Sequence, residues 1–179
     1  MLATVDDALA FLRRLGASET LVLHHEMVAQ VAQDIASAVR LELGCPFDRD
    51  QMLIAAALHD CGKIQFPEEL GAPGERHCAA GELMLLRHGL PETIARVCRT
   101  HCEWKQAIAL EDLFVALADI VWKGTRDEVL EMRVVDGIAA RVDLSAWEVF
   151  ARLEPVLARI ADGGVARLSR CQTLIPARP

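Results

Sequence analysis

The stretch that decides the fold is Met52-Leu53-Ile54-Ala55-Ala56-Ala57-Leu58-His59-Asp60-Cys61-Gly62-Lys63, where seven apolar residues lead into an imidazole beside a carboxylate. Such a run predicts a helix buried on most sides, and Gly62 is expected to end it. Burying His59 and Asp60 without partners costs several kcal/mol, on the order of a small domain's whole stability. A metal ion is the obvious compensation. In the alternative, the two side chains only satisfy helix-end carbonyls and solvent.

The composition favours one helical domain over residues 1–179. Of the 179 residues, 53% are hydrophobic but only 4% are aromatic, so the core is expected to be aliphatic, which favours helices over a β-sandwich. The formal net charge of −7 argues against binding a nucleic-acid polymer, because such binding depends on clustered Lys and Arg. A small anionic substrate stays compatible with that charge, since one metal ion reverses the local field.

The N-terminal residues lack a signal peptide's basic and apolar regions, and no apolar run is long enough to span a membrane. We therefore expect a cytoplasmic protein without membrane attachment, in which the six cysteines stay reduced. Cys98 and Cys102 stand one helical turn apart and could offer two ligands on one face, but small buried thiols are the favoured interpretation. The sequence leaves open whether the chain forms a homo-oligomer.

Helical periodicity and end signals divide the chain into helices with short breaks. Thr4 with Asp7 predicts a capping box, Ser18 caps a long second helix, and Asp48 or Asp50 starts the helix that carries His59 and Asp60. Glycines and prolines predict an irregular loop over 62–74, with Glu68 and Glu69 as surface charges. We expect a loose tail over 163–179, a helix from Asp48 or Asp50 up to Gly62, and further helices over 5–15, 19–43, 75–88, 92–104, 110–123, 127–142 and 145–162.

A small set of polar residues stands out on these apolar helices. Any single core histidine is usually only hydrogen-bonded, but a helical bundle brings ligands from facing helices together on an ion. Helical register places His24 on the core side of its helix and His25 toward a wetter flank. Imidazole with carboxylate suits Fe, Mn, Co, Ni or Zn better than Ca. The full set is His24, His59, Asp60, His77, His101 and Asp119.

The order His, His-Asp, His, His, Asp resembles the HD-domain metal-dependent phosphohydrolase superfamily, over residues 20–126. The local matches are His24-x-x-x-Val28-Ala29 for the first-ligand helix, His59-Asp60-Cys61-Gly62-Lys63, His77-x-x-x-Gly81, and Ala118-Asp119. The resemblance implies an all-α bundle of HD-domain type with a metal site between its helices, and C-terminal helices over 127–162 outside the motif-bearing core.

The resemblance also implies the chemistry. A divalent transition metal ion is expected on His24, His59, Asp60 and Asp119, with His77 and His101 available for a second ion bridged by Asp60. Asp60, Lys63, His77 and His101 are the expected catalytic residues, with Lys63 as a partner for phosphate charge. The expected function is a metal-dependent phosphohydrolase acting on a small phosphate ester or anhydride, such as a nucleotide.

Two departures from the family pattern affect the subfamily. Cys102 stands where binuclear members typically carry a second histidine after His101, which predicts one tightly held ion and a weak second one. The acid that nucleotidase-like members tend to carry is replaced by Lys63. Two alternatives are a di-iron oxygenase of HD type and a non-catalytic module that only binds a phosphorylated ligand.

Overall fold

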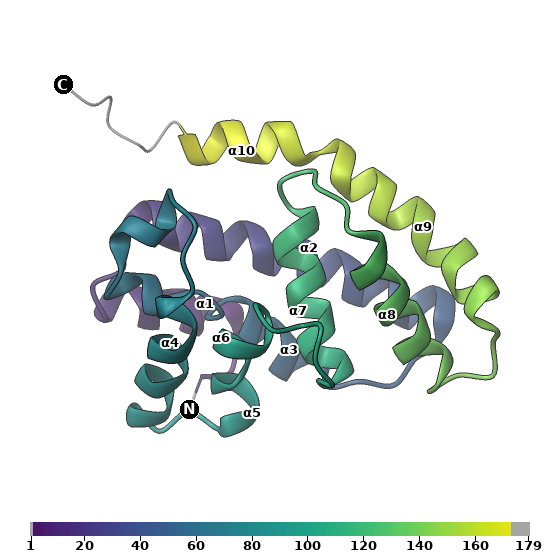
Figure 1. Ribbon diagram of the computed structural model, residues 1–179, viewed down its shortest axis with the longest axis horizontal. Coiled ribbons are helices and arrows are strands. Elements are labelled where there is room, and N and C mark those ends of the chain that lie inside the picture. Colours follow the sequence, from purple (N-terminus) through teal and green to yellow (C-terminus); the bar gives the residue numbers. More distant parts are fainter. Residues whose placement is uncertain (1, 173–179) are drawn as a thin grey trace.

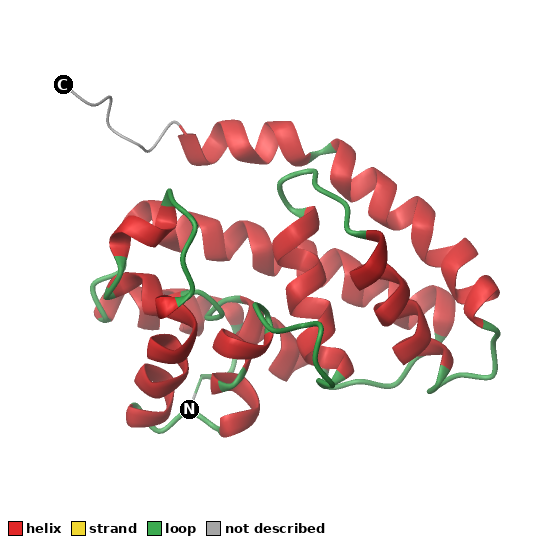
Figure 2. Cartoon of the chain, viewed as in Figure 1, coloured by secondary structure: helices red, strands yellow, loops and turns green. Residues whose placement is uncertain are grey.

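The computed structural model describes residues 2–172, and every regular element in that part of the chain is a helix (Figure 2). This confirms the predicted all-α class. The α-helices are α1 (Val5–Arg14), α2 (Glu19–Leu43), α3 (Arg49–Ala56), α4 (Arg76–Arg87), α5 (Glu92–Ala95), α6 (Val97–Thr100), α7 (Leu110–Val121), α8 (Glu128–Ala139), α9 (Ala146–Asp162) and α10 (Gly164–Gln172), and two 3₁₀ helices, η1 (Cys61–Ile64) and η2 (Pro67–Leu70), separate α3 from α4.

The helix starts follow the capping signals in the sequence. Thr4 and Asp7 form the predicted capping box of α1, and the Ser18 side chain accepts a hydrogen bond from the Leu21 backbone N–H at the start of α2. Asp48, rather than Asp50, caps α3. Each cap satisfies a backbone N–H that has no partner inside its helix.

The long helix α2 and the apolar helix α7 pack against each other and form the centre of the bundle (Figure 1). The helices α4, α5 and α6 gather at one end, whereas α8 and α9 cover the other. The core is aliphatic as predicted, with Phe114 as its largest fully buried side chain. Among the described residues, no helix is long and apolar enough to cross a membrane.

The helix before His59 ends earlier than predicted. α3 stops at Ala56, so His59 and Asp60 lie in tight turns between α3 and η1. The imidazole explains this end, because His59 Nδ1 lies 2.8 Å from the Ala56 carbonyl oxygen, which would otherwise accept from the Asp60 backbone N–H. Gly62 does not end the helix either, since it lies within η1 and has no positive φ.

Gly62 instead permits close packing of η1 on α4. A Cβ on Gly62 would lie 2.0 Å from the His77 carbonyl oxygen and 2.7 Å from the Gly81 backbone nitrogen. A Cβ on Gly81 would in turn meet the Cys98 Sγ at 3.1 Å. Because neither glycine has a side chain, the turn with His59 and Asp60 can lie directly against the first turn of α4, which carries His77.

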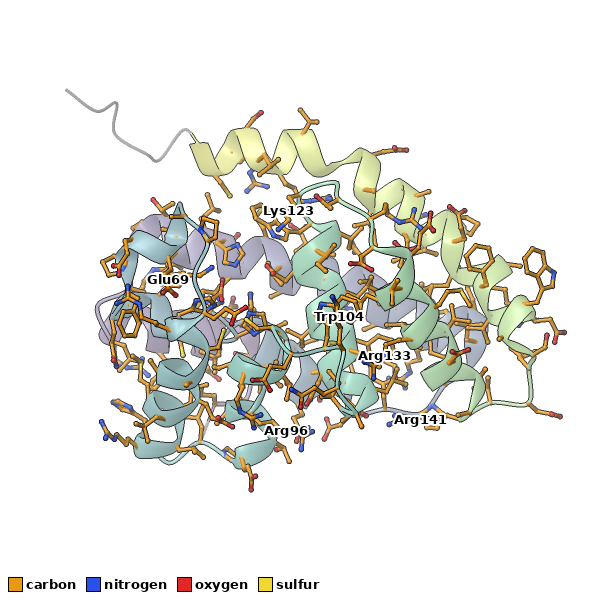
Figure 3. All side chains as sticks on the ribbon, in the orientation of Figure 1. Glu69, Arg96, Trp104, Lys123, Arg133 and Arg141 are labelled. Atoms are coloured by element: carbon orange, nitrogen blue, oxygen red, sulfur yellow. The ribbon has the colours of Figure 1, made fainter. Side chains whose placement is uncertain are left out.

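The predicted helix over 92–104 is also shorter and interrupted. It divides into α5 and α6 and ends at Thr100, so His101 lies at the C-terminal end of α6. The following turns are held from outside, because the Arg133 guanidinium donates to the backbone carbonyls of Trp104 and Gln106. Arg96 forms an ion pair of 3.0 Å with the buried Asp112 of α7, which fixes this end of the bundle (Figure 3).

The predicted loose tail over 163–179 is wrong in its first half. Residues 164–172 form α10, which packs against α2 and α9, whereas 173–179 lie outside the described residues. The Arg167 guanidinium donates to the Trp122 carbonyl oxygen at 2.5 Å and so ties α10 to the end of α7. The segment is short, polar on average and preceded by a glycine pair, so the amphipathic spacing that places Leu168 and Cys171 against the core was overlooked in the sequence.

Candidate metal centre

The residues predicted as first-ion ligands meet in one place. One ligand atom each from His24 of α2, His59 and Asp60 of the turn after α3, and Asp119 of α7 lie within 4.8 Å of one another. Asp60 Oδ2 lies 3.1 Å from His24 Nε2 and 3.6 Å from His59 Nε2. Asp119 Oδ1 lies 3.4 Å from His59 Nε2 and 3.6 Å from His24 Nε2.

The protonation of His59 shows that this cluster suits a cation. Its Nδ1 faces the Ala56 carbonyl oxygen, which only accepts, so Nδ1 carries the proton. Burial lowers the pKa of His59, so the ring is neutral and its Nε2 presents a lone pair. That Nε2 is fully buried, has no hydrogen-bond partner, and faces carboxylate oxygens of Asp60 and Asp119. A lone pair against two carboxylates repels them unless a positive ion lies between.

Asp60 is the central group of the site. Its side chain is 2% exposed, and its Oδ1 is buried without a well-aligned hydrogen bond although His77 Nε2 lies at 2.9 Å and His101 Nε2 at 3.4 Å. Burial alone would raise the pKa of Asp60, but its contacts with the surrounding histidines hold it well below its usual range. The carboxylate is therefore ionised, with one oxygen toward each pair of imidazoles.

Two further histidines have the same orientation as His59. His101 Nδ1 faces the Val97 carbonyl oxygen at 2.9 Å, and His77 Nδ1 faces the Glu69 carboxylate at 2.7 Å. Both rings therefore direct Nε2 toward Asp60. Burial opposes protonation of His77, yet the contact with Asp60 raises the pKa of His77 to about 10 in the metal-free protein. An imidazole whose Nδ1–H is held by an oxygen acceptor is the usual arrangement of a metal-binding histidine.

Glu69 was predicted as a surface charge, and the structure corrects this. Its side chain is buried in η2, where Oε2 accepts hydrogen bonds from the Nδ1 and backbone N–H of His77 (Figure 3). Burial would raise the pKa of Glu69, but these bonds and those from Arg76 lower it to about 2. Glu68 is the exposed member of the pair, as predicted. The sequence offered no periodic signal, because both residues lie in a loop with prolines and glycines.

His25 is also corrected. The ring lies in the core at 0% exposure, not on a wetter flank, and neither nitrogen has a hydrogen-bond partner. It packs edge-on against His59 with ring centroids 5.0 Å apart. His24 is the more exposed of the two, and it alone reaches Asp60 and Asp119. The prediction that His24 points inward was right. His25 is buried as well, because other parts of the chain cover both of these faces of α2.

Lys63 lies at the border between the site and solvent. Its Nζ contacts Asp60 Oδ2 at 2.5 Å, and its side chain is mostly buried, so it is not simply a solvated surface lysine. A cavity of about 850 Å³ opens beside it, within the size range of small-molecule sites. The cavity is lined by residues of α2, η1, η2, α7 and α10, among them His24, Lys63, Asp119, Trp122, Lys123, Leu168 and Cys171.

Cysteines make up part of a second cluster that the sequence interpretation missed. Cys78 and Cys102 lie with His77 and His101, and one ligand atom from each of the four is within 4.8 Å of all the others. Cys98 lies elsewhere, with its Sγ 3.8 Å from Cys61 in the core. All six thiols are free. The available signal was a repeated His-Cys dipeptide, at 77–78 and again at 101–102.

The comparison with protein families agrees with this arrangement. The family model of the HD domain matches residues 22–121, more than half of the chain, and the protein therefore belongs to the HD-domain family. The matched range runs from just before His24 to just after Asp119, so it contains every residue of both clusters. Neither the curated proteins nor the solved structures compared with the chain gave a match.

Proposed function

We propose that this protein is a metal-dependent phosphohydrolase that acts on a small phosphate ester or anhydride, such as a nucleotide. The observation that carries the proposal is the lone pair of His59 Nε2, buried without a partner and facing Asp60 and Asp119 beside an open cavity. When bound there, a divalent ion of Fe, Mn, Co, Ni or Zn supplies Lewis acidity toward water and phosphate oxygens. Its ligands in the proposal are His24, His59, Asp60 and Asp119.

The cavity wall carries two lysines beside the carboxylates of Glu68 and Asp119, and in the proposal these lysines hold an anionic substrate. Lys63 and Lys123 both line it, and Figure 3 shows Lys123 just beyond the end of α7, near α10. In the proposal Lys63 shifts from Asp60 to a phosphate oxygen when the ion neutralises that carboxylate. The ammonium group then holds the phosphate as a point charge. Trp122, which packs on His24 with ring centroids 5.1 Å apart, offers a flat apolar wall for the organic part of the substrate.

The histidines on the other side of Asp60 are assigned a supporting role in the reaction. His77 and His101 direct Nε2 toward Asp60 Oδ1 and lie deeper than His24, away from the cavity lining. They position that carboxylate, and in the proposal they donate hydrogen bonds or protons to phosphate oxygens that reach the centre when no second ion occupies their Nε2 atoms. The single-domain organisation and cytoplasmic location stay predictions, consistent with free thiols at all six cysteines.

The test is metal analysis followed by a hydrolysis screen. Apoprotein would be loaded with each candidate ion and assayed against nucleoside mono-, di- and triphosphates and simple phosphate esters. The screen should give phosphate release with at least one ion, and Asp60→Ala should lose both the ion of the His/Asp site and activity. Asp136→Ala, which removes an exposed carboxylate on α8, is the matched control and should retain both. Metal-loaded protein that binds a nucleotide but returns it intact would favour a binding module instead.

A further inference from the structure

A second cluster lies on the far side of Asp60 from the cavity. His77 and Cys78 stand in the first turn of α4, and His101 and Cys102 stand at the end of α6, which packs against α4. Each helix end thus supplies one imidazole and one thiol from consecutive residues. His77, Cys78 and His101 are buried, and Cys102 is half-buried.

Three distances between donor nitrogen and sulfur atoms fit a tetrahedral site. Cys78 Sγ lies 3.4 Å from His77 Nε2, Cys102 Sγ lies 3.3 Å from His101 Nε2, and Cys102 Sγ lies 3.9 Å from His77 Nε2. A tetrahedral zinc ion with Zn–N bonds of about 2.0 Å and Zn–S bonds of about 2.3 Å requires edges of roughly 3.3 to 3.8 Å between its ligands. The three distances agree with that requirement to within a few tenths of an ångström.

The two imidazoles are already oriented for this role. The Glu69 carboxylate holds the Nδ1–H of His77, and the Val97 carbonyl oxygen holds that of His101. Both Nε2 atoms are thereby directed at the thiols and at Asp60 Oδ1, which has no aligned hydrogen bond of its own. A ligand set with these outer partners in place needs little rearrangement to bind an ion.

We propose that His77, Cys78, His101 and Cys102 form a thiolate-containing metal site that prefers zinc, next to the His/Asp site and different from it in ligand chemistry. Two imidazoles with two thiolates favour Zn²⁺, whereas the two imidazoles and two carboxylates around His59 suit harder ions such as Mn²⁺ or Fe²⁺. On binding, the four donor atoms release to solvent the protons that they still carry, including the proton on His77 Nε2, and each sulfur and each Nε2 donates an electron pair to the ion. The cysteines therefore add two ligands to the second ion, for which the sequence analysis predicted only His77 and His101.

The proposal does not rest on hydrolysis, and its test needs no substrate. Reduced full-length apoprotein would be titrated with Co²⁺ as a spectroscopic probe. The wild type should bind two ions per chain and develop a thiolate-to-cobalt charge-transfer band. The Cys78→Ser/Cys102→Ser double variant should lose the band and one ion, with zinc affinity at this site reduced more than 100-fold, since even outer-shell losses cost about 10–100-fold. Asp119→Asn should keep the band, which separates this site from the proposed catalytic one.

Cys45→Ser is the matched thiol control. Cys45 is buried in the loop after α2, outside both clusters, so this variant should keep the band and both ions. X-ray absorption of the zinc-loaded wild type requires no variant and should show sulfur neighbours around zinc. Zinc with only nitrogen and oxygen neighbours would overturn the proposal. Thiol titration that finds Cys78 and Cys102 joined as a disulfide, unreactive to metal under mild reductant, would overturn it as well.

Discussion

Glu69 Oε2 accepts a hydrogen bond of 2.7 Å from His77 Nδ1 and thereby fixes which nitrogen of that ring faces the metal centre. The same carboxylate oxygen also takes the backbone N–H of His77, so ring and backbone are held together. A loop residue of η2 thus determines the direction of a buried imidazole on α4. In metal sites, partners of this kind contribute to ligand basicity as well as to orientation.

Glu69→Gln should therefore weaken metal binding at His77 about 10–100-fold, because the amide oxygen accepts the hydrogen bond without its negative charge. Zinc affinity of the apoprotein, measured by competition with a chromophoric chelator, checks this. Glu68→Gln is the matched control, since the exposed neighbour contacts only Arg76 among its ion pairs and should leave the affinity unchanged. Equal losses in the two variants would contradict the assigned role.

Substitutions of the two adjacent histidines of α2 should have different effects on metal binding. His24→Ala should lose the ion of the His/Asp site, because His24 Nε2 is 3.1 Å from Asp60 and 3.6 Å from Asp119. His25→Ala should keep that ion but unfold at lower denaturant, because it leaves a cavity beside His59 and large-to-small core changes cost about 2–5 kcal/mol. Metal content after dialysis, with urea unfolding, checks both. Retained metal in His24→Ala would discredit its assignment as a ligand.

Gly62→Ala should destabilise the fold more than the addition of one methyl group usually does. Its Cβ would need the space of the His77 carbonyl oxygen, 2.0 Å away, so η1 and α4 must separate. We expect the free energy of unfolding to fall by about 1–3 kcal/mol. Metal affinity should fall as well, since His59, Asp60 and His77 move apart. Gly71→Ala is the control, because its Cβ would meet nothing within 4 Å. Thermal unfolding and metal content of the two variants measure the difference.

Acid should weaken the fold partly through Glu111. Burial would raise the pKa of this carboxyl, but hydrogen bonds from Arg141 and the Asp48 backbone N–H lower it below 4.5 in the folded protein. A lowered folded-state pKa contributes stability that is complete above the unfolded pKa and disappears as the pH falls. Stability should thus decline below pH 4.5, and less steeply in Glu111→Gln. Urea unfolding of apoprotein between pH 6 and pH 3 measures both slopes, and parallel curves would contradict the prediction.

Much of the bundle was predictable because its signals are local. The caps at Thr4 and Ser18 and the apolar faces of α2 and α7 each depend on residues a few positions apart. The end of α3 was not predictable in this way, since it depends on the His59 ring taking the Ala56 carbonyl oxygen. The apolar pattern of the sequence does not show that a side chain competes with the backbone for a carbonyl oxygen. The pattern alone therefore predicts a helix that continues to Gly62.

The candidate site likewise contains residues that could be predicted from the sequence and residues that could not. Spaced motifs predicted that His24, His59, Asp60 and Asp119 come together, and their ligand atoms do lie within reach of one ion. Glu69 was missed because it contacts His77 across an irregular stretch of eight residues, and Cys78 was missed because its cluster forms only when α6 packs against α4. The burial of His25 likewise depends on α3, which contributes no signal to the register of α2.

The ligands of the His/Asp site come from α2, the turn after α3, and α7, elements far apart along the chain. An ion bound by all of them closes long loops in the polypeptide, as a disulfide would. Closing such loops costs conformational entropy, and only in a largely folded protein has that entropy already been lost. Metal capture should consequently be a late event in folding. Chelation would remove a cross-link from the centre of the molecule, and with it part of the resistance of the whole bundle to unfolding.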